Sequence, residues 1–191
     1  MAEPSEILRE EHEVIEHLLH VLEAMGKEVE RGSHVPKSDL EAALEVVVGF
    51  ADECHHAKEE KALFPILAKV SPKEGAFLVH RLEGDHKAAR QIVRAMRDSI
   101  PGVDVGEGSA RATFAKSAKT YAVLLREHIK AETNRLLPLT DAAIPAAQRK
   151  ELGEEFERIE REETGAGVHE KYEGTIHLLA DKYIHRAARV P

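Results

Sequence analysis

The chain has 191 residues, of which 42% are apolar, 32% are charged and only 4% are aromatic, with no tryptophan. This composition favours a helical bundle and excludes a disordered chain, and the length suits one domain or a domain with an appended helical piece. The net charge of -8 comes without a cluster of Lys and Arg, which argues against nucleic acid as a partner.

Signals for secretion or membrane insertion are lacking in the sequence. The acidic, amphipathic start has neither the basic nor the apolar region of a signal peptide, and no apolar run is long enough to span a membrane. A single cysteine, Cys54, excludes an internal disulfide framework. We therefore expect a cytoplasmic protein with no membrane partner.

Helical periodicity and clear breaks predict the first two helices. One helix is expected over residues 5–31 and ends at Gly32. The next is expected over residues 38–70, where Ser38 and Glu41 have the spacing of a capping box.

Two more helices are predicted before residue 140. The third is expected over residues 71–99, with Ser71 as its N-cap, and the turn-forming sequence IPGVDVGEGS follows it. The fourth begins after Ser109. Four helices of similar length with short connections indicate an all-α, up-down-up-down four-helix bundle over residues 1–140.

Residues 141–191 are too polar to form a core of their own. Pro145 opens a highly charged helix, and a last helix begins near Val168, after the sequence GAG. We expect a C-terminal helical hairpin extension packed on the bundle. The alternative is an arm that joins two chains in a homodimer.

The sequence HHAKEEKALFP, residues 55–65, contains two His/Glu pairs at the i, i+4 spacing that places both side chains on one face of a helix. The pairs are His55 with Glu59 and His56 with Glu60. The apolar stripe of the helix shares the face of the first pair. We therefore expect His55 and Glu59 to point inward, and His56 and Glu60 to lie beside the site or face solvent.

The predicted fourth helix contains a second pair. In HIKAETNRLLP, Glu132 follows His128 by four positions, and Leu and Pro stand at +8 and +10, as they do in the earlier stretch read from His55. One further His lies on the apolar face of the first helix and another on that of the third. The groups expected to point inward are His12, His55, Glu59, His86, His128 and Glu132.

Six such groups are costly to bury unless a cation neutralises the carboxylates and uses the imidazole lone pairs. This donor set suits two borderline-hard metal ions bridged by carboxylates, with iron first, manganese second and zinc as a further alternative. Because no cysteine shares the face, an iron-sulfur cluster or a thiolate zinc site is not expected.

These residues resemble the hemerythrin-like family, also called the HHE cation-binding domain. The similar features are LREEHEVIEHLL around His12, the first H-x-x-x-E followed by L-F-P, LEGDHKAAR around His86, and the second H-x-x-x-E. The resemblance covers residues 5–140. It implies a bundle around a non-haem di-iron centre that binds oxygen or responds to nitric oxide, peroxide or iron.

One position departs from the pattern of the oxygen carriers in that family. The carriers have a second His one turn after the third-helix ligand, where this chain has Arg90. The ligand set is then one nitrogen short, and His169 in the extension is a candidate to complete it. A vacant position would favour exogenous ligands or redox turnover over oxygen storage.

Three functions remain open at this stage. The first is a non-enzymatic di-iron protein that binds or senses oxygen, nitric oxide, peroxide or iron, with a small diatomic ligand or peroxide as its partner. The second is a di-iron redox enzyme for peroxide or nitric oxide turnover or for iron-sulfur centre repair. The third is a scaffold with structural metals. Tyr121 is expected to pack in the core, with a role near the metal as the alternative.

Overall fold

The computed structural model describes residues 2–165 and 167–185, and the regular elements in that part of the chain are helices. Elements named η have π-helical hydrogen bonding. The bundle elements are α1 (Pro4–Glu30), α2 (Lys37–Val46), η1 (Val47–His56), η2 (Glu59–Leu63), α3 (Phe64–Val70), α4 (Glu74–Asp104), α5 (Gly108–Ala131), η3 (Glu132–Leu136) and α6 (Leu137–Ala143). The extension contains α7 (Ala146–Ile159), η4 (Glu160–Thr164), α8 (Val168–Ala180) and η5 (Asp181–His185).

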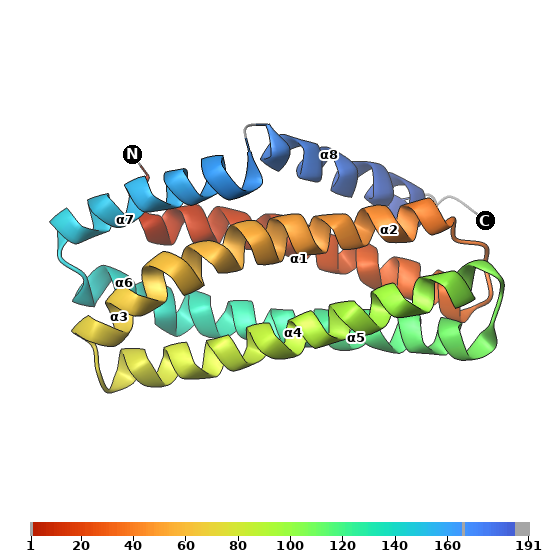
Figure 1. Cartoon of the computed structure of the whole chain (residues 1–191), viewed down its shortest axis with the longest axis horizontal. Helices are drawn as coiled ribbons and strands as arrows, with labels where there is room; N and C mark the ends of the chain where they lie inside the picture. The colour runs from red at the N-terminus through yellow and green to blue at the C-terminus, as the bar shows by residue number, and fades with distance from the viewer. Residues whose placement is uncertain (1, 166, 186–191) are drawn as a thin grey trace.

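Four antiparallel rods form the bundle (Figure 1). The first rod is α1, the second runs from α2 to α3, the third is α4, and the fourth runs from α5 to α6. Each rod reverses the direction of the one before it, with a short connection at each end of the bundle. The predicted up-down-up-down four-helix bundle is confirmed.

Two predicted helix starts are shifted. The second rod begins at Lys37, directly after Pro36, and Ser38 makes no capping hydrogen bond there. The third rod begins at Glu74 instead of residue 71. Ser71 still contributes, because its hydroxyl accepts a hydrogen bond of 3.1 Å from the N–H of Gly75.

The third rod also ends later than predicted. It continues through Pro101 to Asp104, five residues beyond the expected end at residue 99. The reason is burial: Ile100 and Val103 are only 3% and 6% exposed, so continuing the helix places both in the core. Tertiary packing has overridden the local turn signal.

Pro65 and Pro138 each follow a π-helical segment by two residues. A proline ring clashes with the carbonyl four residues earlier, and a wider turn relieves that clash. The helices therefore do not end at the prolines but continue to Val70 and Ala143. As a consequence, Glu59 and Glu132 each stand at the first position of a π-helical segment.

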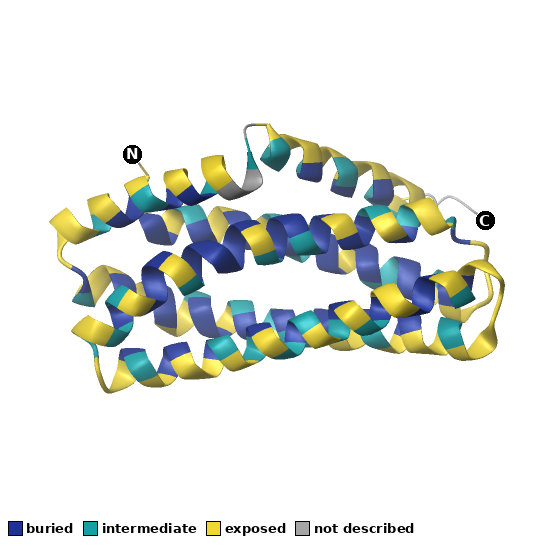
Figure 2. Ribbon diagram, in the orientation of Figure 1, coloured by how far each residue is buried: buried dark blue, intermediate teal, exposed yellow. Residues whose placement is uncertain are grey.

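Two apolar clusters fill the bundle, as the buried inner faces in Figure 2 indicate. One includes Leu22 and Phe114, and the other includes Leu8 and Phe64. The buried His and Glu side chains belong to neither cluster. The polar site therefore lies in a bundle whose remaining interior is apolar.

The extension differs from the expected hairpin. Its two helices follow one another along the bundle instead of folding back on each other (Figure 1). Phe156 of α7 joins one apolar cluster, and Tyr172 of α8 joins the other. Each helix thus covers a different part of the core.

Close contacts hold the extension against the second rod. A Cβ at Gly49 would lie only 1.9 Å from the Tyr172 hydroxyl, so a larger residue there would displace the Tyr172 ring. Near the end of the extension, Lys182 and Tyr183 both donate to Asp39. The extension therefore buries part of the outer side of the second rod, whereas Glu41, Glu45 and Glu53 remain exposed.

None of the helices described is both long and apolar enough to cross a membrane.

Candidate metal centre

Seven buried side chains from all four rods form the site. His12 comes from α1, His86 from α4 and His128 from α5, whereas the second rod supplies three residues. The seven are His12, His55, His56, Glu59, His86, His128 and Glu132, and each is at most 5% exposed.

One half of the site combines His12 and His55 with both carboxylates. The ligand atoms of His12, His55, Glu59 and Glu132 all lie within 4.8 Å of one another. The His12 Nε2 atom is 3.1 Å from the Glu132 Oε2 atom, and the His55 Nε2 atom is 3.9 Å from the Glu59 Oε2 atom. These four groups could share one cation.

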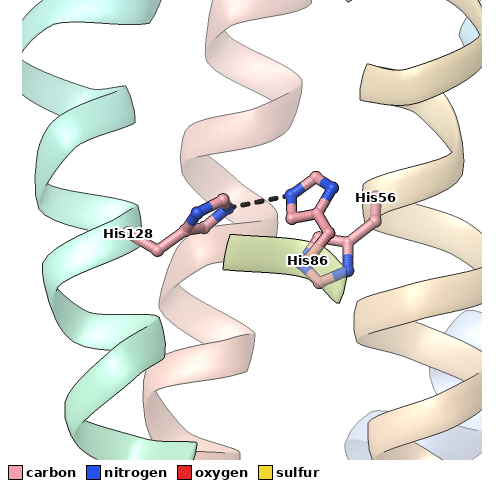
Figure 3. A group of neighbouring side chains, drawn as sticks. All are labelled: His56, His86 and His128. Atoms are coloured by element: carbon pink, nitrogen blue, oxygen red, sulfur yellow. Dashed lines mark hydrogen bonds between the residues drawn. The ribbon is translucent and has the colours of Figure 1, made fainter. Parts of the chain in front are cut away.

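The other half combines the same two carboxylates with His86 and His128, whose Nε2 atoms are 3.0 Å apart. His56 joins these two imidazoles, since the ligand atoms of the three residues also lie within 4.8 Å of one another. Figure 3 shows the three rings approaching one another from separate helices, with the His86–His128 contact dashed. Three imidazoles are therefore available on this side.

Glu132 and Glu59 lie between the two halves. Glu132 directs one oxygen to each side, with Oε1 2.8 Å from the Nε2 atom of His128 and Oε2 3.1 Å from that of His12. The Oε2 atom of Glu59 is 3.4 Å from the Nε2 atom of His86 and 3.9 Å from that of His55. Both carboxylates therefore have the placement of bridging groups.

The inward-facing atoms are short of hydrogen bonds. Within residues 2–165 and 167–185, no hydrogen bond of adequate geometry reaches the Nε2 atoms of His12, His55 and His56 or the carboxylate oxygens of Glu59 and Glu132. The contacts of 2.8–3.9 Å between these atoms therefore do not satisfy them as hydrogen bonds. Buried polar atoms left unpaired are costly, so the arrangement fits side chains that share cations.

The outer ring nitrogens, in contrast, all have partners. The Nδ1 atoms of four histidines face a carboxylate: His55 faces Glu11 at 2.8 Å, His56 faces Asp52 at 3.3 Å, His86 faces Glu60 at 2.7 Å and His128 faces Asp85 at 3.4 Å. The Nδ1 atom of His12 lies 3.3 Å from the Thr133 hydroxyl. If each Nδ1–H donates outward, each Nε2 lone pair points to the centre, which is the arrangement metal-binding histidines use.

Arg90 connects two of these outer partners. Its Nε atom donates to both oxygens of Asp52, at 2.8 and 3.0 Å, and its Nη2 atom donates to Glu60 at 2.9 Å. Asp52 and Glu60 in turn contact His56 and His86. Arg90, which stands where the carriers have a ligand, therefore orients two histidines from outside the site.

A second outer network connects the site to the extension. Glu11, which faces His55, also accepts a hydrogen bond from the fully buried Lys58. Lys58 donates at 2.7 Å to Glu160 of η4. Burial acts against it, but His55 and Lys58 lower the pKa of Glu11 from 4.5 to about 2.

Without bound cations, the two buried carboxylates of Glu59 and Glu132 lie unfavourably close to each other. Burial and the neighbouring Glu132 raise the pKa of Glu59. Burial opposes it, but His128 and His12 hold the pKa of Glu132 well below its ordinary value. Two carboxylates in such proximity repel each other, and bound cations would relieve this repulsion.

The pKa values of the histidines are also shifted in different directions. Against the effect of burial, Glu132 and other carboxylates raise the pKa of His128 to about 10. Burial, together with the neighbouring imidazoles, lowers the pKa of His56 well below its ordinary value. His56 is therefore neutral at pH 7, with a lone pair ready for a metal.

The spacing of the inward atoms fits a metal coordination sphere. Two ligand atoms at about 2.1 Å from one ion and at right angles to each other are about 3.0 Å apart. Three of the observed separations, 2.8, 3.0 and 3.1 Å, agree with this value, and the two that involve Glu59 are longer, at 3.4 and 3.9 Å. Five imidazoles and two carboxylates suit borderline metals such as iron, manganese or zinc.

Six of the seven side chains were predicted from the sequence to point inward, and His56 was not. The structure buries His56 to 2% exposure, contrary to the expectation that it lies beside the site or faces solvent. Glu60, given the same two alternatives, contacts His86 from outside the site. The doubled His in HHAKEE was the available signal, and the π-helical hydrogen bonding of η1 explains why it misled us.

His169 does not lie with these seven side chains. Its ring packs edge-on against Phe50 at 4.8 Å, and its nitrogens lie 3.8 Å from Glu160 and 3.3 Å from Glu173. His169 does group with Glu11 and Glu160, but the ammonium of Lys58 contacts both carboxylates there. His56, and not His169, therefore lies with the other inward-facing imidazoles.

Comparison with protein families places this geometry in context. The model of the Hemerythrin HHE cation binding domain matches residues 3–140, which contain all seven side chains. Comparisons with curated proteins and with solved structures found no significant match.

Proposed function

This chain belongs to the hemerythrin HHE cation-binding family, and on that premise we propose that it is a non-haem di-iron protein that binds or senses a small oxidant or gas: oxygen, nitric oxide or peroxide. Iron itself is the further candidate for what it senses. The observation that carries the proposal is the pair of inward carboxylates, Glu59 and Glu132, shared between two groups of imidazoles.

The residues have separate roles in this proposal. His12 and His55 would hold one ion, and His56, His86 and His128 the other, with both carboxylates bridging. The ions, when bound, would supply a redox-active centre with room for an exogenous ligand.

The chain's own outer network would keep the imidazoles in place. Glu11, Asp52, Glu60 and Asp85 hold the outer nitrogens of four histidines, so the Nε2 atoms converge before a cation arrives. The apolar clusters on either side exclude water from the inward face. Both features favour selective binding of small ligands.

The test is the reaction of anaerobically iron-loaded protein with oxygen, nitric oxide and hydrogen peroxide, each followed by optical spectroscopy. We expect one of these ligands to change the spectrum in proportion to the iron present. Glu59→Gln should abolish the change, whereas His177→Gln, at an exposed position away from the site, should preserve it. An unchanged spectrum with all three ligands would reject the proposal.

The alternative is a di-iron redox enzyme for peroxide or nitric oxide turnover, or for iron-sulfur centre repair. A surface pocket that reaches His56 and Tyr121 favours it, because turnover needs repeated access of substrate. Burial, with Asp52, raises the pKa of Tyr121, so its phenol stays protonated. Many turnovers per centre would favour the enzyme, and a single stoichiometric reaction would favour the binding or sensing protein.

A further inference from the structure

A pocket of about 200 Å³ opens between the second rod and α4, beside the three-histidine half of the site. His56 and Tyr121 line its buried part, and both are at most 2% exposed. Arg94 and Arg97 line its exposed part. We call it the arginine pocket.

The size of the arginine pocket limits what it can hold. Pockets for drug-sized organic molecules usually measure about 300–1,000 Å³, and a water molecule takes about 30 Å³. A volume of about 200 Å³ therefore suits an inorganic ligand of a few atoms with some water.

The charge of the arginine pocket selects the sign of the ligand. Three arginines and one carboxylate, Asp52, line it, and Arg90 already pairs with Asp52. Arg94 and Arg97 have no ion pair with any residue that the structure describes. Within the lining of this pocket, positive charge is therefore in excess, although Arg97 also borders a neighbouring pocket lined by Glu41, Glu45 and Glu53.

The remaining walls strengthen the attraction and supply a donor. Val47, Val48, Ala89 and Val93 are apolar, which lowers the local dielectric and makes each guanidinium more effective. A tyrosine hydroxyl can donate a hydrogen bond to an anion. Tyr121, which lines the pocket together with His56, can supply such a donor.

We propose that the arginine pocket binds a small inorganic monoanion next to the three-histidine half of the centre, with Arg94 and Arg97 attracting it and the Tyr121 hydroxyl donating to it. This ligand class goes beyond the proposed function, whose candidates oxygen, nitric oxide and hydrogen peroxide are neutral at pH 7, and only its link to the metal centre rests on that function. It favours oxidants and nitrogen oxides that carry a charge over neutral dioxygen as the molecules that use this approach.

The test is equilibrium binding of thiocyanate, a small linear monoanion, to the purified full-length protein, followed by the infrared band of its C≡N bond. We expect one saturable site. The double variant Arg94→Gln/Arg97→Gln should weaken binding about tenfold, and Tyr121→Phe should weaken it about threefold, since only one hydrogen bond is lost. More salt should weaken binding to wild type and have less effect on the double variant.

The matched control is Lys87→Gln/Lys119→Gln, which removes the same charge from exposed positions outside the pocket. Binding within about twofold of wild type is expected for it. The inference is overturned if wild type has no saturable site or if the control weakens binding as much as the arginine variant.

Metal analysis of the same samples separates this outcome from that of the proposed function. Protein that lacks a two-iron centre but binds thiocyanate through Arg94 and Arg97 would support the pocket and reject the di-iron proposal. Protein that holds two irons and binds thiocyanate equally well without Arg94 and Arg97 would support the di-iron proposal and reject the pocket.

Discussion

Replacing Lys58 with methionine should strongly destabilise the protein, because it removes the cation between Glu11 and Glu160. Glu11 is 2% exposed and Lys58 is fully buried. Burial alone would raise the pKa of Glu11, but His55 and Lys58 lower it from 4.5 to about 2. This difference corresponds to about 3 kcal/mol in favour of the ionised carboxylate.

Lys58→Met leaves the charge of Glu11 buried with His55, the larger cause of that shift, as its remaining partner. We therefore expect a loss of about 1–3 kcal/mol in the free energy of unfolding. The assay is urea unfolding at pH 7, followed by circular dichroism, in samples of equal metal content. The double variant Glu11→Gln/Lys58→Met removes both charges and should recover at least half of the loss.

The pH dependence gives a further check of the same pair. Because the pKa of Glu11 is lowered in the folded state, its contribution is present above about pH 4.5 and is lost as the pH falls toward 2. The deficit of Lys58→Met should therefore shrink over that range. A single variant as stable as wild type, or a double variant whose loss equals the sum of the two single losses, would refute this reasoning.

Three further predictions concern the site directly. His56→Ala should halve the metal content by removing a ligand from one side, whereas the exposed His177→Ala should leave it unchanged; elemental analysis checks both. Arg90→Ala frees two outer carboxylates and should weaken metal binding about 10–100-fold in a chelator competition, and an unchanged affinity would contradict the orienting role. Because the pKa of His128 is raised to about 10, a proton must leave it when metal binds, so affinity should rise with pH and an indicator dye should detect released protons.

The sequence was sufficient to predict the bundle and six of its inward polar groups. Apolar periodicity fixed the four rods, and the i, i+4 spacing of His55 with Glu59 and of His128 with Glu132 placed each pair on one face. Apolar periodicity alone does not explain why Leu and Pro recur after each His/Glu pair. Each proline lies just past a π-helical segment that starts at the candidate bridging carboxylate.

His56 was missed because its segment does not have α-helical geometry. In α-helical turns, His56 would lie well around the helix from His55. The hydrogen bonding of η1, from Val47 to His56, is π-helical. A π-helical turn holds more residues, so adjacent side chains are separated by a smaller angle and both histidines can face the bundle.

The second rod is also covered on part of its outer side, by a segment that lies far along the chain. The extension covers its outer side: Tyr172 packs against Gly49, His169 against Phe50, and Glu160 pairs with Lys58. These contacts join residues more than 100 positions apart, and local sequence patterns carry no record of them.

The most direct test of the central claim is Mössbauer spectroscopy, with metal analysis, of iron-loaded protein. If Glu59 and Glu132 bridge two ions, we expect two irons per chain in one magnetically coupled centre. The two-histidine and three-histidine environments should give two doublets of equal area. A single iron per chain, or two irons without magnetic coupling, would contradict the shared-carboxylate centre.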